Sequence, residues 1–414
     1  MFNNFVVTKT EDDGLVGSLR WALEAPVDRI VTFSPSLDGK IIRLKSHINV
    51  EGDCLVDATD LVITIVGGRL RIIGSNVEIR NLRVRPTEIV PGGNFEDRDG
   101  ISIGKLDINT AAPVSNVVLR NCSMTFAIDE NLATWGGPTD IKVIDCLIAN
   151  GLGASYHPQG RHSMGVFITS GVKNYLLERC FVGNNEWRNP AVTGTDNVQL
   201  INNWFSNFGE EGTVFYGKNT NARVIGNVYE AGSDTVLSKS PIVTRESTST
   251  SSIYCSSNWA LGLNNDVPIV YGPIVSNEPE RDPLNENPII FDEDKIIGNI
   301  VYRSGALPRD MTDFEILKNA LKRTGKIIDV SPPIDTREAN PDELLELIDD
   351  PATEPTEPNN EVELLTRVAV LEARVETLEQ NLEALDEYVR DLSAYLRDST
   401  LSLYNSLNLL KMKE

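Results

Sequence analysis

The sequence predicts an all-β fold, a parallel β-helix, with a short capping helix at its N-terminal end and a C-terminal α-helical coiled coil. Three patterns indicate this architecture: a strand-like phrase that recurs, a helical segment before it, and a heptad repeat near the C-terminus. We expect a β-helix over 1–310, a C-terminal extension with short helices over 311–348, a linker over 349–361 and an oligomerising coiled coil over 362–414.

The recurring phrase begins with Asn or Asp, alternates aliphatic with polar residues, and ends on a polar residue or glycine. It occupies residues 76–81, 116–121, 140–145, 174–179, 197–202 and 221–226. Several copies lie roughly two dozen residues apart, which is the length of one β-helix coil. Asn tolerates a left-handed backbone and can bond its neighbours along a stacked ladder. A β-sandwich is the alternative, but Asn-Gly and Asp-Gly hairpin signals are scarce between these runs.

Two helical segments flank the repeats. Residues 17–24 have helical spacing with Ser18 as N-cap, so this segment can close the open end of the β-helix. Residues 313–322 predict another short helix, and a polar, proline-containing stretch follows. Residues 349–361 are acidic and proline-rich, which is the composition of a linker.

Beyond the linker, apolar residues alternate three and four apart. They are Leu364, Val368, Leu371, Val375, Leu378, Leu382, Leu385, Val389, Leu392 and Leu396. This pattern predicts coiled-coil self-association through residues 362–414. The mixture of Val and Leu at the core positions leaves dimer and trimer both open, and only the β-helix context favours a homotrimer.

Composition limits the partners. The formal charge of −22 at pH 7 disfavours nucleic acid, because an acidic surface repels phosphates. We also expect no membrane insertion and no export signal, since neither a long apolar stretch nor a basic, apolar leader is present. Five cysteines at wide spacings, without a CxxC pair, suggest neither a zinc site nor a disulfide framework.

Six stretches of the chain resemble the pectate lyase family of polysaccharide lyases, in that family's order. They are 17–24, 67–86, 97–103, 121–123 followed by 128–132, 157–165, and 187–190 followed by 198–203. The resemblance covers most of residues 5 to 230 and implies a right-handed parallel β-helix.

The resemblance also implies Ca²⁺-dependent β-elimination of a uronate polymer. Removing the proton on carbon 5 builds negative charge on the uronate carboxylate, so the site needs a cation and a base. Ca²⁺ prefers hard oxygen ligands, which Asp97, Asp99, Asp129 and Glu130 offer. The family's base is an arginine in an Arg-x-Pro motif, matched here by Arg188. His157, Arg161 and His162 are candidate substrate-binding residues, as is Trp187, which would contact a sugar face.

The sequence departs from the family at several positions. Ala191, Val192 and Thr193 follow Pro190, where family members usually place another arginine. Ala133 stands where a further carboxylate is expected, and the expected substrate-binding lysine near Ser163 or Met164 is absent.

Each candidate also has a structural interpretation. Asp97 and Asp99 can be solvated turn residues. His157 and His162 can satisfy a loop, because no third ligand for a zinc triad stands at helical spacing from them. Arg188 can pair with Asp129 or Glu130.

Two functions follow. The first is a phage-tail-type spike or fibre in the virion, trimeric, made in the host cytoplasm, bound to other tail proteins, and binding or depolymerising an acidic host polysaccharide. The second is a free, extracellular Ca²⁺-dependent pectate or uronate lyase. A structural or adhesive cell-surface protein remains a further alternative, because β-helices host many functions.

Overall fold

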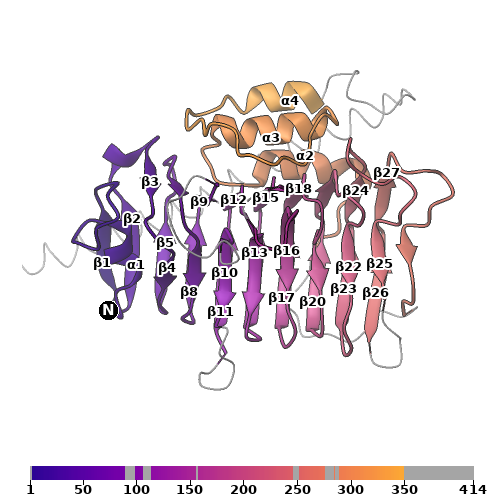
Figure 1. Cartoon of the computed structure of the whole chain (residues 1–414), viewed down its shortest axis with the longest axis horizontal. Coiled ribbons are helices and arrows are strands. Elements are labelled where there is room, and N and C mark those ends of the chain that lie inside the picture. Colours follow the sequence, from indigo (N-terminus) through magenta and orange to yellow (C-terminus); the bar gives the residue numbers. More distant parts are fainter. Residues whose placement is uncertain are drawn as a thin grey trace, which may run out of the picture.

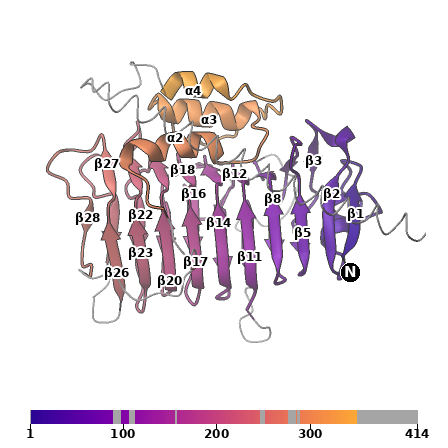
Figure 2. The same cartoon turned by 180° about the vertical axis from the view of Figure 1, so that it is seen from behind.

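The computed structural model of the chain describes residues 2–88, 98–105, 113–154, 157–245, 251–275, 284 and 289–348. Asp97, the linker over 349–361 and the coiled coil over 362–414 lie outside the described residues. In the described part, the chain winds into a β-helix whose three faces are parallel sheets, which Figures 1 and 2 show from opposite sides. The β-helix prediction is therefore confirmed, and the β-sandwich alternative is wrong.

Sheet A contains the recurring phrases. Its ten strands are, in spatial order, β1 (Asn3–Val7), β2 (Arg29–Phe33), β5 (Cys54–Asp57), β8 (Val77–Arg80), β11 (Ser115–Arg120), β14 (Thr139–Ile144), β17 (Lys173–Glu178), β20 (Asp196–Ile201), β23 (Asn221–Ile225) and β26 (Ser252–Ser256). The six phrases stack in register, so that Val117 pairs with both Val77 and Ile141.

Sheets B and C form the other two faces. Sheet B runs β3 (Ile41–Arg43), β6 (Thr64–Val66), β9 (Arg83–Arg85), β12 (Ser123–Thr125), β15 (Leu147–Ala149), β18 (Phe181–Gly183), β21 (Trp204–Ser206), β24 (Val228–Glu230) and β27 (Trp259–Leu261). Sheet C runs β4 (Ile48–Val50), β7 (Leu70–Ile72), β10 (Ile101–Gly104), β13 (Glu130–Trp135), β16 (Met164–Ile168), β19 (Ala191–Val192), β22 (Thr213–Phe215), β25 (Ile242–Thr244) and β28 (Val270–Tyr271). Each coil therefore passes from sheet A to sheet B to sheet C.

Left-handed residues bracket the strands of sheet A, as the Asn pattern predicts. Asn76 precedes β8 with a φ of 58°, and Asn116 is the second residue of β11 with a φ of 56°. Asn81 and Asn121 follow the two strands with φ of 55° and 49°. The side chains form ladders between coils: Asn116 Nδ2 donates to Asn76 Oδ1 at 2.9 Å. The inward-facing residues of these strands are apolar and buried, and they form one continuous core with those of sheets B and C.

Three of the five cysteines, Cys122, Cys146 and Cys180, form a second ladder, one residue beyond the left-handed turn. The Cys122 N–H donates to Cys146 Sγ at 3.4 Å, and the Cys146 N–H donates to Cys180 Sγ at 3.4 Å. In the next coils Asn takes the place of Cys, and the Asn203 N–H donates to Asn227 Oδ1 at 2.9 Å. All five cysteines are free, so the described thiols serve packing and hydrogen bonding rather than cross-linking.

The N-terminal end is capped as predicted. The helix α1 (Leu19–Leu23) begins after Ser18, whose Oγ accepts from the Trp21 N–H at 3.3 Å. Leu19, Ala22 and Leu23 are buried on the first coils. A short 3₁₀ helix, η1 (Pro35–Leu37), follows between β2 and β3.

Three helices cover the outer face of sheet B: α2 (Glu293–Arg303), α3 (Met311–Leu321) and α4 (Asp342–Ile348). They bury a second apolar cluster against sheet B that includes Phe181, Trp204 and Val228. Helical structure therefore begins before the expected boundary at 310, because the last described strand ends at Tyr271 and α2 starts at Glu293. None of the described helices is long and apolar enough to cross a membrane.

A buried ion-pair network joins α3 to sheet B. Arg85 Nη1 lies 2.7 Å from Asp310 Oδ2, and Arg85 Nη2 lies 2.6 Å from Asp313 Oδ1. All three side chains are fully buried. Asp310 is also the N-cap of α3, accepting from the Asp313 N–H at 3.0 Å. Burial alone would raise the pKa of Asp310, but the charge and hydrogen bonds of Arg85 outweigh it and lower that pKa.

Replacing Asp310 by Ala leaves Arg85 with one fewer counterion and α3 without its cap. We expect a loss of about 3–5 kcal/mol in the free energy of unfolding, measured by urea denaturation at neutral pH. Glu315→Ala on the same helix breaks only the exposed pair with Lys318 and is expected to cost less than about 1 kcal/mol. The folded-state pKa of Asp310 is lowered, so its stabilisation is present above the unfolded pKa and is lost as the pH falls through the folded pKa. The two variants should therefore converge in acid, and equal losses at neutral pH would contradict the network.

Candidate functional site

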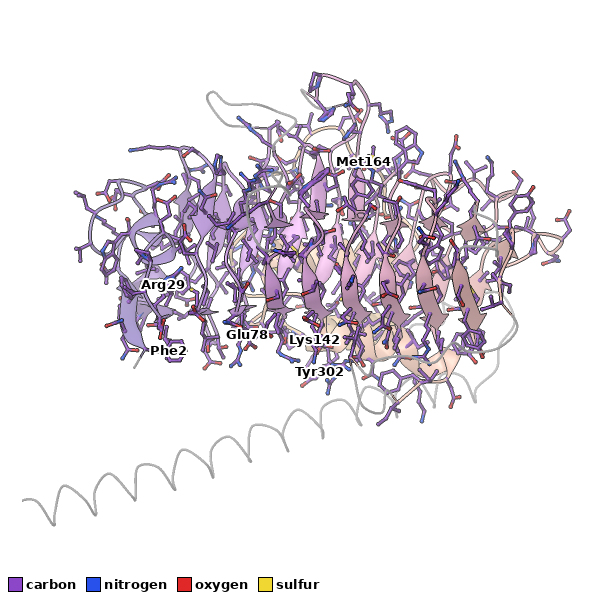
Figure 3. All side chains as sticks on the ribbon, turned by 90° about the horizontal axis from the view of Figure 1, so that it is seen from below. Phe2, Arg29, Glu78, Lys142, Met164 and Tyr302 are labelled. Atoms are coloured by element: carbon purple, nitrogen blue, oxygen red, sulfur yellow. The ribbon has the colours of Figure 1, made fainter. Side chains whose placement is uncertain are left out.

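The predicted site residues lie in the connections from sheet B to sheet C of four successive coils. Asp99 lies between β9 and β10, Asp129 and Glu130 lie at the start of β13, His162 lies just before β16, and Arg188 lies before β19. Because the coils stack in register, residues 89 positions apart in sequence meet on one face. Figure 3 labels Met164 at the start of β16, on the side of the molecule away from Glu78 and Lys142 of sheet A.

Arg188 forms an ion pair with Glu130. The Glu130 side chain is 1% exposed and that of Arg188 is 25% exposed, and the Arg188 guanidinium lies 4.2 Å from the centre of the Phe167 ring. Burial lowers the pKa of Arg188, while Tyr216, Asp129 and Asp99 act against that shift. The structural pairing of Arg188 with Glu130 that the sequence left open is therefore present.

Asp99 and Asp129 complete a carboxylate cluster with Glu130. One oxygen from each of the three lies within 4.8 Å of the others. Arg69 Nη1 lies 2.9 Å from Asp99 Oδ2, and both side chains are buried. Two cations, Arg69 and Arg188, thus balance part of the charge of three carboxylates.

The two histidines lie against Asp129. His162 Nε2 is 3.0 Å from Asp129 Oδ1, and His157 Nε2 is 3.9 Å from the same oxygen. The two imidazole rings stack, with their centres 3.6 Å apart. Both residues are buried, at 5% and 6% exposure. The partner for the histidines is therefore an aspartate from the preceding coil.

Arg161 and Trp187 lie beside the cluster. Arg161 Nε is 2.5 Å from Glu186 Oε2 and its Nη1 is 2.9 Å from Asp329 Oδ1, in the segment that follows α3. Trp187 is half-buried and pairs with Met164 through an isolated bridge. Asp97 lies outside the described residues, so its predicted role stays a prediction.

A buried amide network fixes these connections, and sequence reasoning did not anticipate it. Asn131 Nδ2 donates to Asn185 Oδ1 at 3.0 Å, and Asn185 Nδ2 donates to Asn189 Oδ1 at 3.1 Å. Asn185 Oδ1 also accepts from the Gly151 N–H at 2.9 Å. All three side chains are fully buried. The network therefore holds the segments that carry Glu130, His162 and Arg188 in fixed relative positions.

The position where a further carboxylate was expected lies in the floor of the cluster. Ala133 is fully buried and pairs with Ser102 on one side and Phe167 on the other. Phe167 lies under the Arg188 guanidinium. An apolar floor thus replaces the missing carboxylate in this chain.

The donor atoms fit a hard cation. Carboxylate oxygens are the ligands that Ca²⁺ prefers, and Asp99, Asp129 and Glu130 gather them within reach of one ion. Among the described residues, Glu130 Oε2 is buried and has no hydrogen-bond partner. A buried carboxylate oxygen without a partner is costly, and a bound cation would satisfy it.

Comparisons with known proteins support a pectate-lyase-like β-helix. No family model matches the chain. The chain is 29% identical over 239 residues to a probable pectate lyase C from Emericella nidulans, which covers 56% of this chain and 49% of that protein. It is 23% identical over 151 residues to pectate lyase 2 from Ambrosia artemisiifolia, which covers 34% of this chain and 37% of that protein. The chain thus spans about half or less of the length of these curated relatives.

Solved structures agree on the fold. The structure of jun a 1, the major allergen from cedar pollen, matches 73% of this chain and 88% of that chain, with a TM-score of 0.58 and 16% identity. A polygalacturonate lyase fused with a self-assembling amphipathic peptide matches 73% of this chain and 92% of that chain, with a TM-score of 0.50 and 12% identity. The chain has the β-helix of these proteins.

Removing Arg188 tests whether it competes with a cation for Glu130. We expect Arg188→Ala to bind Ca²⁺ at least about tenfold more tightly than the unmodified chain, because one positive charge leaves the carboxylate cluster. Isothermal titration with CaCl₂ measures this. Arg43→Ala removes the same charge from an exposed position in β3 and should leave the affinity unchanged. Weaker binding after Arg188→Ala would show that Arg188 supports the cation site instead.

Proposed function

We propose that the chain binds an acidic polysaccharide built of uronate units and cleaves it by β-elimination, with the sheet B to sheet C connections as its site. The observation that supports this most directly is the juxtaposition of Arg188, whose pKa is lowered by burial, with three carboxylates on one face of a pectate-lyase-like β-helix. The curated relatives are pectate lyases by name, which agrees with this substrate class.

The reaction removes the proton on carbon 5 of a uronate and expels the oxygen on carbon 4. The electron pair of the broken C–H bond forms a carbon 4–carbon 5 double bond, and the leaving oxygen takes up a proton from water. Negative charge develops on the substrate carboxylate, so the site must place positive charge there. Ca²⁺ held by Asp99, Asp129 and Glu130 would supply that charge when bound.

Arg188 takes the carbon 5 proton in this proposal. A guanidinium is a base only after it has lost its own proton, which its ordinary pKa opposes. Burial lowers the pKa of Arg188, whereas the anionic partners around it hold the proton on. When one of these carboxylates becomes a metal ligand, the cation offsets its negative charge. The pKa of Arg188 then falls further, which favours the neutral guanidine. The face of the Phe167 ring packs against the Arg188 guanidinium and fixes the orientation of its plane.

The flanking residues contact the polymer. Trp187 is half-buried beside Arg188, so part of its ring is available to a sugar face. Arg161 is 46% exposed and can offer its guanidinium to a second uronate, although Glu186 and Asp329 hold it in place. His157 and His162 are more buried than these two residues and offer a substrate less surface.

Arg188→Ala tests the reaction. The ultraviolet absorbance of unsaturated uronate products is followed over a panel of acidic polysaccharides, with Ca²⁺ and with a chelator. We expect Ca²⁺-dependent product from the unmodified chain and a loss of about 100-fold or more in the Arg188→Ala variant. Arg43→Ala should retain full activity. Activity that survives Arg188→Ala would remove Arg188 from the base role, and no product on any polymer would overturn the cleavage proposal.

We further propose that residues 362–414 assemble the chain into a homotrimer of a phage-tail spike; the heptad pattern supports self-association, and the β-helix context favours the trimer over the dimer. Three sugar sites on one particle would raise avidity without any new contact. The virion location and contacts with other tail proteins belong to this proposal.

Native mass spectrometry tests the assembly. We expect a trimer for the full chain and a monomer for a chain that ends at residue 348, since the β-helix core is self-contained within the described residues. A trimer in both forms would place the contact in the β-helix. A full-length monomer would contradict the proposal.

A further inference from the structure

Besides the carboxylate cluster, Asp129 belongs to a second group of potential ligands. One ligand atom from each of Asp129, His157 and His162 lies within 4.8 Å of the other two, and all three residues are buried. The sequence left the histidines without a third ligand, because Asp129 stands in the preceding coil rather than at helical spacing. The stacked coils provide it.

We propose that Asp129, His157 and His162 bind a divalent transition-metal ion of the Zn²⁺ type. Imidazole nitrogen favours borderline ions such as Zn²⁺ over Ca²⁺, and two histidines with one carboxylate form a common three-residue ligand set that leaves a position open. This site uses different chemistry from the Ca²⁺ site and stands whether or not the chain cleaves a polysaccharide.

The distances suit such an ion. Metal–ligand bonds of about 2.0–2.1 Å in tetrahedral geometry place ligand atoms roughly 3.3 Å apart. His162 Nε2 and His157 Nε2 lie 3.0 Å and 3.9 Å from Asp129 Oδ1, on either side of that value. The two imidazole rings are stacked with their planes 17° from parallel. Because the lone pair of each nitrogen lies in its ring plane, the rings must tilt relative to each other to bind one ion.

Metal binding requires a change in the hydrogen bonding of both histidines. His162 Nε2 is hydrogen-bonded to Asp129 Oδ1 at 3.0 Å, and a proton on that nitrogen must move to Nδ1 or to solvent before it binds the ion. The Gln159 N–H donates to His157 Nδ1 at 3.2 Å, so in the neutral ring the proton is on Nε2. Binding through Nε2 moves that proton to Nδ1 and breaks this bond. Water can replace this bond, because Gln159 is exposed and its N–H can donate to solvent.

The two sets of ligands share Asp129, which couples their occupancy. A Zn²⁺ ion on the histidines takes one carboxylate away from the Ca²⁺ set, leaving Asp99 and Glu130. The buried Glu130 Oε2 has no hydrogen-bond partner among the described residues. Its negative charge adds to the potential near the Zn²⁺ ligands and near the Ca²⁺ ligands. We therefore expect Zn²⁺ to weaken Ca²⁺ binding, and the reverse.

The chain contains a matched control for each histidine. It has three histidines, and His47 lies near the N-terminal cap, far along the stack from the other two. Isothermal titration with ZnCl₂ is run on the full chain and on His157→Gln, His162→Gln and His47→Gln. We expect one Zn²⁺ per chain, with affinity at least about tenfold lower in each of the first two variants and unchanged in the third.

X-ray absorption at the zinc edge provides a measurement that needs no variant. Histidine ligation produces outer-shell scattering from the imidazole rings, which carboxylate ligation does not. We expect two imidazoles and a carboxylate oxygen in the unmodified chain. Zinc held by carboxylates or thiols alone, or equal affinity in all three variants, would overturn the proposal. Folding of each variant is checked by circular dichroism, and the spectrum of the unmodified chain decides the matter if a variant fails to fold.

Discussion

Left-handed turns that bracket the strands of sheet A are the constraint on which the rest of this structure depends. Each turn ends a strand after a fixed number of residues and directs the next one into sheet B, so successive coils keep the same registration. Asn is suited to the turn because it accepts positive φ, as Asn81 and Asn121 do. Its amide also bonds to a neighbouring coil, as Asn81 Nδ2 does by donating to Thr59 Oγ1 at 2.9 Å. Without constant registration, the connections between sheets B and C would not lie above one another.

The site depends on a second constraint, which is local and polar. Those connections differ in length, so strand pairing alone would leave them poorly defined. Asn131 donates to Asn185 of another coil, Asn185 donates to Asn189 within its own connection, and Asn185 also accepts from the Gly151 N–H of a third connection. A network of this kind is specific because each unpaired amide would be costly in the interior. Asn131 and Asn189 are direct neighbours of Glu130 and Arg188 in sequence, so the network constrains the segments that carry this ion pair.

Charge then determines what the site can do. The chain is strongly acidic overall, and its candidate site concentrates three carboxylates with two arginines and two histidines. Buried like charges repel unless counterions separate them, so Arg69 and Arg188 act as internal cations. Metal ions would compete with these arginines for the same oxygens. The substrate, the metal and the protonation of Arg188 are therefore linked through the same few atoms.

The sequence by itself determined the β-helix, the capping helix at Ser18 and the α3 helix, because periodic apolar residues, turn-forming Asn and helix caps are local signals. It also predicted Asp99, Asp129, Glu130 and Arg188 as candidate site residues, through motif resemblance. Which of them meet was decided only by the tertiary structure: the pairing of Asp129 with the histidines, the Arg69–Asp99 pair and the Asn network all join residues from different coils. The covering of sheet B by α2, α3 and α4 likewise rests on buried pairs such as Arg85–Asp310, which are 225 residues apart. Such contacts depend on the stacking of coils, and spacing along the chain does not encode how loops of unequal length fold over a common face.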